Sequence, residues 1–185
     1  NVNGLTSLDV SNNTALTNLS CANNSLTSLD VSQNTALIDL NTGGNANITS
    51  LDLSQNTALI QLSCNMNQLT SLDLSNNTLV TDVQLMYNQL TNIDLSNNTV
   101  LTNLYLYSNQ LTTLDLSQNT ALNFLGVKGN QLTILDLSSN TALTTLWCNN
   151  NQLTSLDLSN NTALINLKCN DNQLNSLDLR NANNT

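Results

Sequence analysis

Residues 90–110 read LTNIDLSNNTVLTNLYLYSNQ, and variants of this 21-residue unit fill almost the whole chain. Successive units start 21 residues apart except after Leu26, where the step is 22, and they start at Leu5, Leu26, Ile48, Leu69, Leu90, Leu111, Leu132, Leu153 and Leu174. A fixed period of this length is typical of a solenoid, in which each coil buries its apolar face only by stacking on its neighbours. We therefore predict one elongated solenoid domain over residues 1–185.

Each unit divides into two halves that share the pattern LxxLxLxxN. Within each half, apolar and polar residues alternate with a period of two, as at Leu104, Tyr105 and Leu106. This alternation indicates a short strand with one buried face, and no segment has the apolar spacing of a helix. We predict a mainly β fold of about eight or nine right-handed coils, each with two short parallel strands and little helix.

An asparagine ends each half of the unit, so the aligned units contain two asparagine columns, which begin at Asn13 and Asn24. The turns of a solenoid leave backbone groups that need hydrogen-bond partners. An asparagine amide can both donate and accept, and it tolerates turn conformations. We predict that both columns are structural ladders that bond the backbone of the neighbouring coil.

The composition argues against several classes of function. The 185 residues carry a net charge of −9, from 12 aspartates against three basic residues, and contain no histidine and no glutamate. So few cations do not suit nucleic acid or an anionic membrane surface as a partner. No apolar run is long enough to span a bilayer, so we expect no membrane insertion. The chain begins without a signal peptide and in phase with the repeat, so we expect a mature domain or part of a longer protein.

All four cysteines occupy one position of the unit, which other units fill with Thr, Leu or Val; they are Cys21, Cys64, Cys148 and Cys169. A position shared with Leu and Val is expected in the core, where free cysteine behaves as a small apolar residue. Cys148 and Cys169 fall on neighbouring coils, so a disulfide between them is the alternative. Because no histidine or second cysteine column supports a metal ligand set, we expect no metal and no cofactor.

The centre of the first predicted strand is aspartate in every unit: Asp9, Asp30, Asp52, Asp73, Asp94, Asp115, Asp136, Asp157 and Asp178. Carboxylates on stacked strands, about 4.8 Å apart, repel by roughly 0.9 kcal/mol per pair in water. We interpret this column, the Asp ladder, as a solvated face, with weak calcium binding as the alternative. Nine equal positions offer no single pair of carboxyls with separated pKa values, so we expect no catalytic residue and no enzyme.

The second predicted strand has a variable outer face, and it supplies the candidate ligand-binding residues: Tyr87, Tyr105, Tyr107, Gly126, Lys128, Trp147 and Lys168. Outward aromatic residues on a repetitive scaffold are typical of a binding surface. Gly126 falls between Tyr105 and Trp147 in one column, which predicts an open slot with aromatic walls and a bare glycine floor. Such a slot suits a sugar ring or a side chain of a partner. The alternative is that the aromatic residues, including Phe124 one strand position earlier, only cover the strands.

The unit resembles the leucine-rich repeat family, whose signature LxxLxLxxNxL is met by Leu101, Leu104, Leu106, Asn109 and Leu111. Its nested 21-residue form, LxxLxCxxNQLTxLDLSxN, resembles a bacterial subclass found in secreted and surface proteins, especially of Bacteroidetes-type bacteria. The resemblance covers residues 5 to about 180 and implies a solenoid on a secreted or cell-surface protein.

The chain departs from this family pattern at both ends. The lengthened second unit contains Gly43 and Gly44, which suggests a bulged loop, and Arg180 stands where the last unit would have serine, as a cap or by drift. The helical convex segment of many family members is missing, so we expect little curvature.

We predict a non-catalytic binding module of a secreted or cell-surface bacterial protein that recognises a protein or glycan through its variable strand face, for example in adhesion. The alternatives are a structural spacer or stalk of an adhesin, or an ice-binding ladder on the threonine columns. The Asp ladder argues against ice binding, which needs a flat, uncharged array. A ladder function needs uniform coils, whereas recognition needs the singular Tyr, Gly, Trp and Lys positions.

Overall fold

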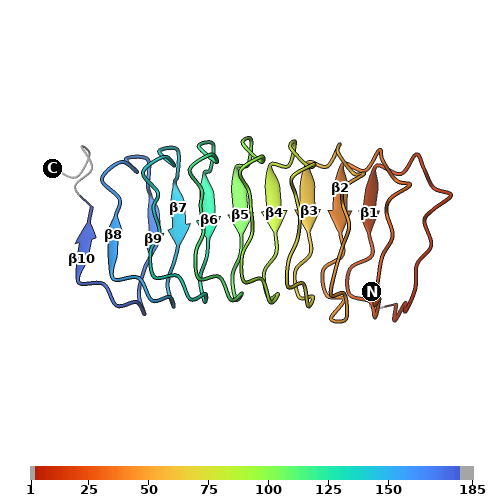
Figure 1. Ribbon diagram of the computed structural model, residues 1–185, viewed down its shortest axis with the longest axis horizontal. Coiled ribbons are helices and arrows are strands. Elements are labelled where there is room, and N and C mark those ends of the chain that lie inside the picture. The colour runs from red at the N-terminus through yellow and green to blue at the C-terminus, as the bar shows by residue number, and fades with distance from the viewer. Residues whose placement is uncertain (1–2, 180–185) are drawn as a thin grey trace.

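The chain winds into a stack of short coils along one axis (Figure 1). The computed structural model describes residues 3–179, and none of these residues lies in a helix. Consequently, this part of the chain contains no long apolar helix of the kind that crosses a membrane. One parallel sheet contains eight strands: β1 (Asn18–Ser20), β2 (Asp39–Asn41), β3 (Gln61–Ser63), β4 (Asp82–Gln84), β5 (Asn103–Tyr105), β6 (Phe124–Gly126), β7 (Thr145–Trp147) and β9 (Asn166–Lys168).

The strands of this sheet keep one register, so equivalent residues stack. Leu104 at the centre of β5 pairs with Leu125 of β6, which pairs with Leu146 of β7. The step is 21 residues along most of the stack but 22 between Leu40 and Leu62. The fold class predicted from the repeat, a helix-free parallel β solenoid, is confirmed.

The extra residue of the second unit is accommodated in a turn and not in the sheet. There the Ile48 amide donates to the Asn45 carbonyl at 3.0 Å. The Asn67 side-chain oxygen, whose equivalents on other coils accept such an amide, is buried without a hydrogen-bond partner. The insertion therefore costs one hydrogen bond of an asparagine ladder, while Asn67 still donates to the Thr42 carbonyl and the strand pairing stays intact. Arg180, the departure in the last unit, lies outside the described residues.

Stacked apolar columns fill the interior of the coils. From β2 to β7 the central residue of each strand, Leu or Val, is almost completely buried, and so is the cysteine position at Cys64 and Cys148. Burial raises the pKa of both thiols to about 12, so they are neutral core groups. All four cysteines are free, with Cys169 half-buried. The core position was predicted correctly, and the alternative disulfide is not formed.

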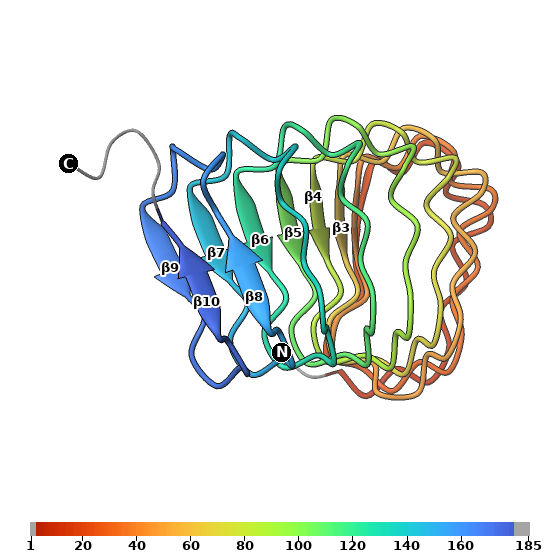
Figure 2. The ribbon, with the colours of Figure 1, turned by 60° about the vertical axis from the view of Figure 1, so that its left-hand side comes forward.

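Within residues 3–179, the second strand predicted for every coil forms only in the last two coils. There β8 (Ser155–Asp157) pairs with β10 (Ser176–Asp178) on the opposite side of the coil from β7 and β9 (Figure 2). In earlier coils the same segment buries its apolar residues, as at Ile93 and Leu95, but is not assigned as a strand. The prediction of two strands per coil was wrong because alternation reports which face is buried, not whether neighbouring coils approach closely enough to pair.

Both asparagine columns are ladders between coils, as predicted. In the first column, the Asn98 amide group donates to the carbonyls of Leu74 and Asn77 at 3.1 and 2.9 Å. In the second, the Asn109 amide group donates to the Leu85 carbonyl at 2.9 Å, and its oxygen accepts from the Leu90 amide at 3.1 Å. The second column gives amides such as that of Leu90 an acceptor, and both columns add inter-coil donors to carbonyls of the turns.

Candidate ligand-binding site

The outward face of the eight-stranded sheet changes in character along the stack. Side chains alternate across a strand, so the first and third residues of each strand face outward and the central one faces the core. On β1 to β4 the outward residues are Asn, Ser, Asp and Gln. On β5 to β7 they include Tyr105, Phe124 and Trp147, and on β9 they include Lys168. Aromatic residues are thus confined to adjacent strands, with polar strands on one side and a lysine on the other.

Four rings pack against one another on these strands, and we call Tyr105, Tyr107, Phe124 and Trp147 the aromatic cluster. Tyr105 stacks on Phe124 with ring centroids 4.5 Å apart, and Tyr107 stacks on Trp147 at 5.7 Å. Edge-to-face contacts join Phe124 to Trp147 at 5.4 Å and Tyr105 to Tyr107 at 6.1 Å. All four side chains are half-buried. Ring pairs in these geometries stabilise one another beyond their buried area, so the cluster is a preformed surface feature.

The open slot predicted above Gly126 is not present, because the Tyr107 ring occupies that space. A Cβ atom at Gly126 would lie 2.5 Å from the Tyr107 hydroxyl oxygen and closer still to two of its ring carbons. Gly126 is buried under this ring. The prediction failed because Tyr107 belongs to the turn after β5, and its side chain reaches across to the neighbouring coil. The Tyr107 ring therefore packs directly on Gly126, and no open space is left above the glycine for a ligand.

Lys168 extends the cluster toward the C-terminal coils. Its ammonium nitrogen lies 4.0 Å from the centre of the Trp147 ring, within the range of a cation–π interaction. Because β9 follows β7 in the sheet while Tyr107 lies over β6, the lysine and the tyrosine cover opposite faces of the indole. The tryptophan is thus held between an aromatic ring and a cation.

Two polar atoms inside the cluster lack hydrogen-bond partners. The Tyr107 hydroxyl and the Trp147 indole nitrogen are both buried and unpaired. Burial raises the pKa of Tyr105 and Tyr107, so both phenols are neutral, and the Asp82 carboxylate contributes to the shift at Tyr105. Unpaired buried donors are unfavourable, and they would be relieved if acceptors reached them.

The structure gathers five of the seven predicted residues and places two beside them. Tyr105, Tyr107, Gly126, Trp147 and Lys168 meet at the cluster. Tyr87 lies on the preceding coil, where its amide donates to the Tyr107 carbonyl, and the exposed Lys128 lies on the following coil. Phe124 was absent from the prediction. Its signal was that it is the one aromatic residue in the other outward position of a strand.

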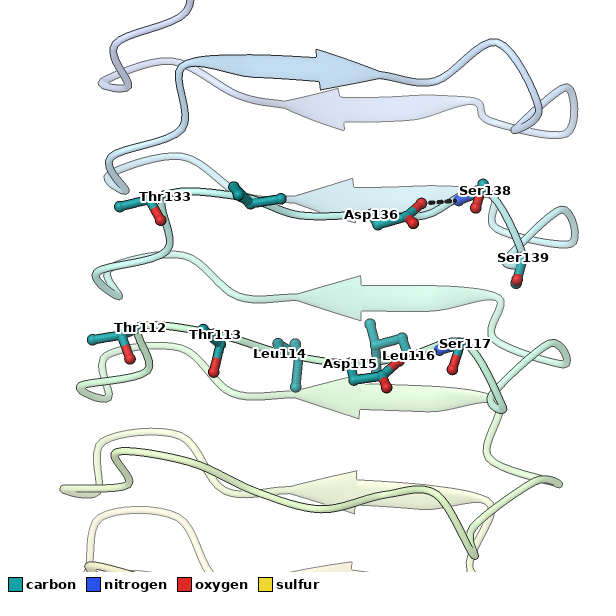
Figure 3. A pocket seen from close by; sticks show the side chains of 11 residues that line it. Thr112, Thr113, Leu114, Asp115, Leu116, Ser117, Thr133, Asp136, Ser138 and Ser139 are labelled. Atoms are coloured by element: carbon teal, nitrogen blue, oxygen red, sulfur yellow. Dashed lines mark hydrogen bonds between the residues drawn. The ribbon is translucent and has the colours of Figure 1, made fainter.

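Grooves lie between the Asp segments on the other side of the coils. One of them, of about 370 Å³, lies between residues 112–117 and 133–139 and is bordered by Asp115, Asp136 and the exposed Ile134 (Figure 3).

Each ladder aspartate from Asp9 to Asp157 accepts a hydrogen bond from the backbone amide of the serine two residues later; at Asp136 the distance is 2.9 Å. The aspartates thus form the turns of the coils, a role that the sequence interpretation missed. Among residues 3–179, no three or more Asp, Glu, Cys or His side chains are grouped to hold a metal ion.

These turns make acid sensitivity an expected property of the fold. Hydrogen bonds from the following serine lower the pKa below the ordinary 3.8 at Asp9, Asp30, Asp52, Asp73, Asp94, Asp115 and Asp136. A lowered folded-state pKa stabilises the fold above the unfolded value, and the stabilisation is lost as pH falls through the folded one. We expect thermal melts to give a constant melting temperature from about pH 7 to 5 and a fall below about pH 4. A melting temperature that rises on acidification would mean that carboxylate repulsion outweighs these bonds.

Solved structures of bacterial leucine-rich repeat proteins share this fold. The functional domain of InlJ from Listeria monocytogenes, which includes a cysteine ladder, is 32% identical with a TM-score of 0.70, over 94% of this chain and 48% of that one. A leucine-rich repeat protein of Leptospira interrogans is 25% identical with a TM-score of 0.86, over 95% and 49%. No protein-family model and no curated protein matches the chain. The chain therefore has the fold of bacterial leucine-rich repeat proteins and spans about half the length of these two.

Proposed function

We propose that the chain is a non-catalytic binding module whose binding face is centred on the aromatic cluster and Lys168. The carrying observation is the cluster itself: four packed rings and a cation on an outward face that is elsewhere made of small polar residues. The core does not require these rings, because the equivalent positions of other coils hold no aromatic residue and are mostly polar, with Asn, Ser, Asp and Gln the commonest. Half-buried, rigid aromatic residues are the usual anchors of protein recognition.

The arrangement favours a protein segment over a glycan as the ligand. A sugar ring binds an aromatic side chain by lying on an open ring face. Both faces of Trp147 are covered, one by Tyr107 and the other by Lys168. What remains accessible is the exposed part of four half-buried rings, which suits apolar side chains of a partner.

Charge on the same sheet gives the partner an expected orientation. Asp39 and Asp82 face outward on β2 and β4, on one side of the cluster, and Lys168 lies on the other side. A partner segment would be complementary in charge if it placed a basic residue near β2 to β4 and an acidic residue near β9. Such complementarity affects specificity and association rate more than affinity.

The cellular setting is part of the proposal. The nested unit LxxLxCxxNQLTxLDLSxN resembles a subclass of secreted and surface proteins of Bacteroidetes-type bacteria, and we infer a secreted or cell-surface location on that basis. The similarity to the InlJ domain and to the Leptospira protein supports a bacterial leucine-rich repeat protein.

Replacing Trp147 by alanine tests the binding face. We expect affinity to fall by about 2 kcal/mol, or about 30-fold, because the change removes the ring that contacts Tyr107, Phe124 and Lys168. The ligands are peptides selected on the wild-type protein from a random phage-displayed library, and the measurement is titration calorimetry. A glycan array probed with the wild type forms the second arm.

The matched control is Ile134→Ala, which removes a side chain that is 76% exposed on the Asp face and is expected to leave affinity unchanged. Melting curves of both variants confirm folding. Undiminished peptide binding by Trp147→Ala would overturn the proposed face, and binding of glycans but no peptides would overturn the ligand class.

A spacer function is the second candidate, and it is favoured by the uniform asparagine ladders along the stack. A spacer needs only the ladders, so it predicts that no selected ligand depends on the aromatic cluster.

A further inference from the structure

One position in each coil has a left-handed backbone conformation. Aligned from coil to coil, these residues are Asn23, Gly44, Met66, Tyr87, Ser108, Gly129, Asn150 and Asp171, with φ between 53° and 72°. The conformation is fixed by the stacking, because the amides of this column from Asn23 to Asn150 each donate to a carbonyl of the next coil. The Met66 amide bonds to the Met86 carbonyl and the Tyr87 amide to the Tyr107 carbonyl, both at 2.8 Å. A single residue therefore cannot relax out of this conformation.

Met66 and Tyr87 are the two bulky residues in this column; Ser108, the third residue there that is not Gly, Asn or Asp, is small. Glycine, asparagine and aspartate tolerate positive φ, whereas a bulky side chain there is strained. Neither residue gains burial in exchange, since 56% of Met66 and 52% of Tyr87 is exposed. The two strained, exposed apolar residues lie on adjacent coils. Strain that contributes nothing to the core points to a role at the surface.

We propose that Met66 and Tyr87 form a docking edge for an apolar segment of the partner protein, continuous with the aromatic cluster. This inference rests on the proposed function and extends its binding face from the strands to the adjoining turns. Continuity is given by the bond between the Tyr87 amide and the Tyr107 carbonyl, which places the edge directly beside a member of the cluster. A flexible methionine next to a rigid tyrosine suits aliphatic or aromatic side chains of varied shape.

The test uses substitutions that should change stability and binding in opposite directions. In the full chain, Met66→Asn and Tyr87→Asn relieve the strain, so each is expected to raise the melting temperature by about 3 °C. The double variant is expected to bind peptides selected on the wild-type protein about tenfold more weakly. If the two residues are strained but take no part in binding, the substitutions will raise the melting temperature without weakening peptide binding.

Ile134→Asn is the matched control, because it changes an exposed apolar residue on the Asp face whose φ is not positive. Neither the melting temperature nor peptide affinity should change. If the double variant binds as tightly as wild type while Trp147→Ala loses binding, the docking edge is overturned and the proposed function stands. A fall in melting temperature would overturn the strain argument. If no selected peptide depends on Trp147, the proposed function fails and the docking edge fails with it.

Discussion

Replacing Asn98 by alanine is expected to lower the free energy of unfolding by about 2 kcal/mol. The Asn98 side chain is fully buried, and its amide group donates to the carbonyls of Leu74 and Asn77 on the preceding coil. Alanine would remove one of the two donors at each carbonyl, because the Asn77 amide still bonds to Leu74 and the Val80 amide to Asn77; each lost bond contributes roughly 0.5–1.5 kcal/mol. Because Asn98 lies in a middle coil, fraying of an end cannot relieve the defect. Denaturant-induced unfolding measures the change.

Asn97→Ala is the control for this prediction. Asn97 is the exposed neighbour of Asn98, and its side chain makes one hydrogen bond of 3.4 Å to the Ser75 carbonyl. Its loss should change the free energy of unfolding by no more than about 0.5 kcal/mol. Equal effects of the two substitutions would mean that the ladder bonds contribute little beyond an ordinary surface amide.

Much of the fold is predictable from the sequence because a repeat applies each local rule many times. The apolar columns, the core cysteines and the asparagine ladders all follow from positions that recur at a fixed spacing. Strand pairing on the Asp side is not predictable in this way, because it depends on the distance between coils. The role of the aspartates had a visible signal that the interpretation did not use. Serine follows each ladder aspartate from Asp9 to Asp157 by two residues, the spacing of a side-chain-to-backbone turn.

The sequence predicted which candidate residues share a column but not how their side chains pack. Coil alignment places Tyr105, Gly126 and Trp147 in one column, and the structure keeps them there. Alignment cannot give the direction in which a long side chain turns, so the occupation of the Gly126 position by Tyr107 was not foreseen. The strain at Tyr87 was equally hidden, because it depends on a backbone conformation that only the inter-coil bonds reveal.

Replacing Gly126 by alanine is expected to lower the free energy of unfolding by about 2 kcal/mol, although alanine is ordinarily the better residue in a strand. The added methyl group would overlap the Tyr107 ring, so the ring must move away and lose its stacking on Trp147. Trp147 is the only tryptophan of the chain, so its fluorescence emission should shift as the neighbouring ring departs. Gly126→Leu should show the same effects more strongly.

A double-mutant cycle tests whether the cost of a side chain at position 126 comes from overlap with the Tyr107 ring or from β6 itself. In a Tyr107→Ala background the space above Gly126 is free, so adding Gly126→Ala should cost about 0.5 kcal/mol or less. The difference between the two backgrounds, about 1.5 kcal/mol, is the coupling between the glycine and the tyrosine. Equal costs in both backgrounds would contradict this overlap and place the constraint in the backbone of β6. With the predicted coupling, Gly126 and Tyr107 act as one unit, and the rigidity of the aromatic cluster depends on the glycine buried beneath one of its rings.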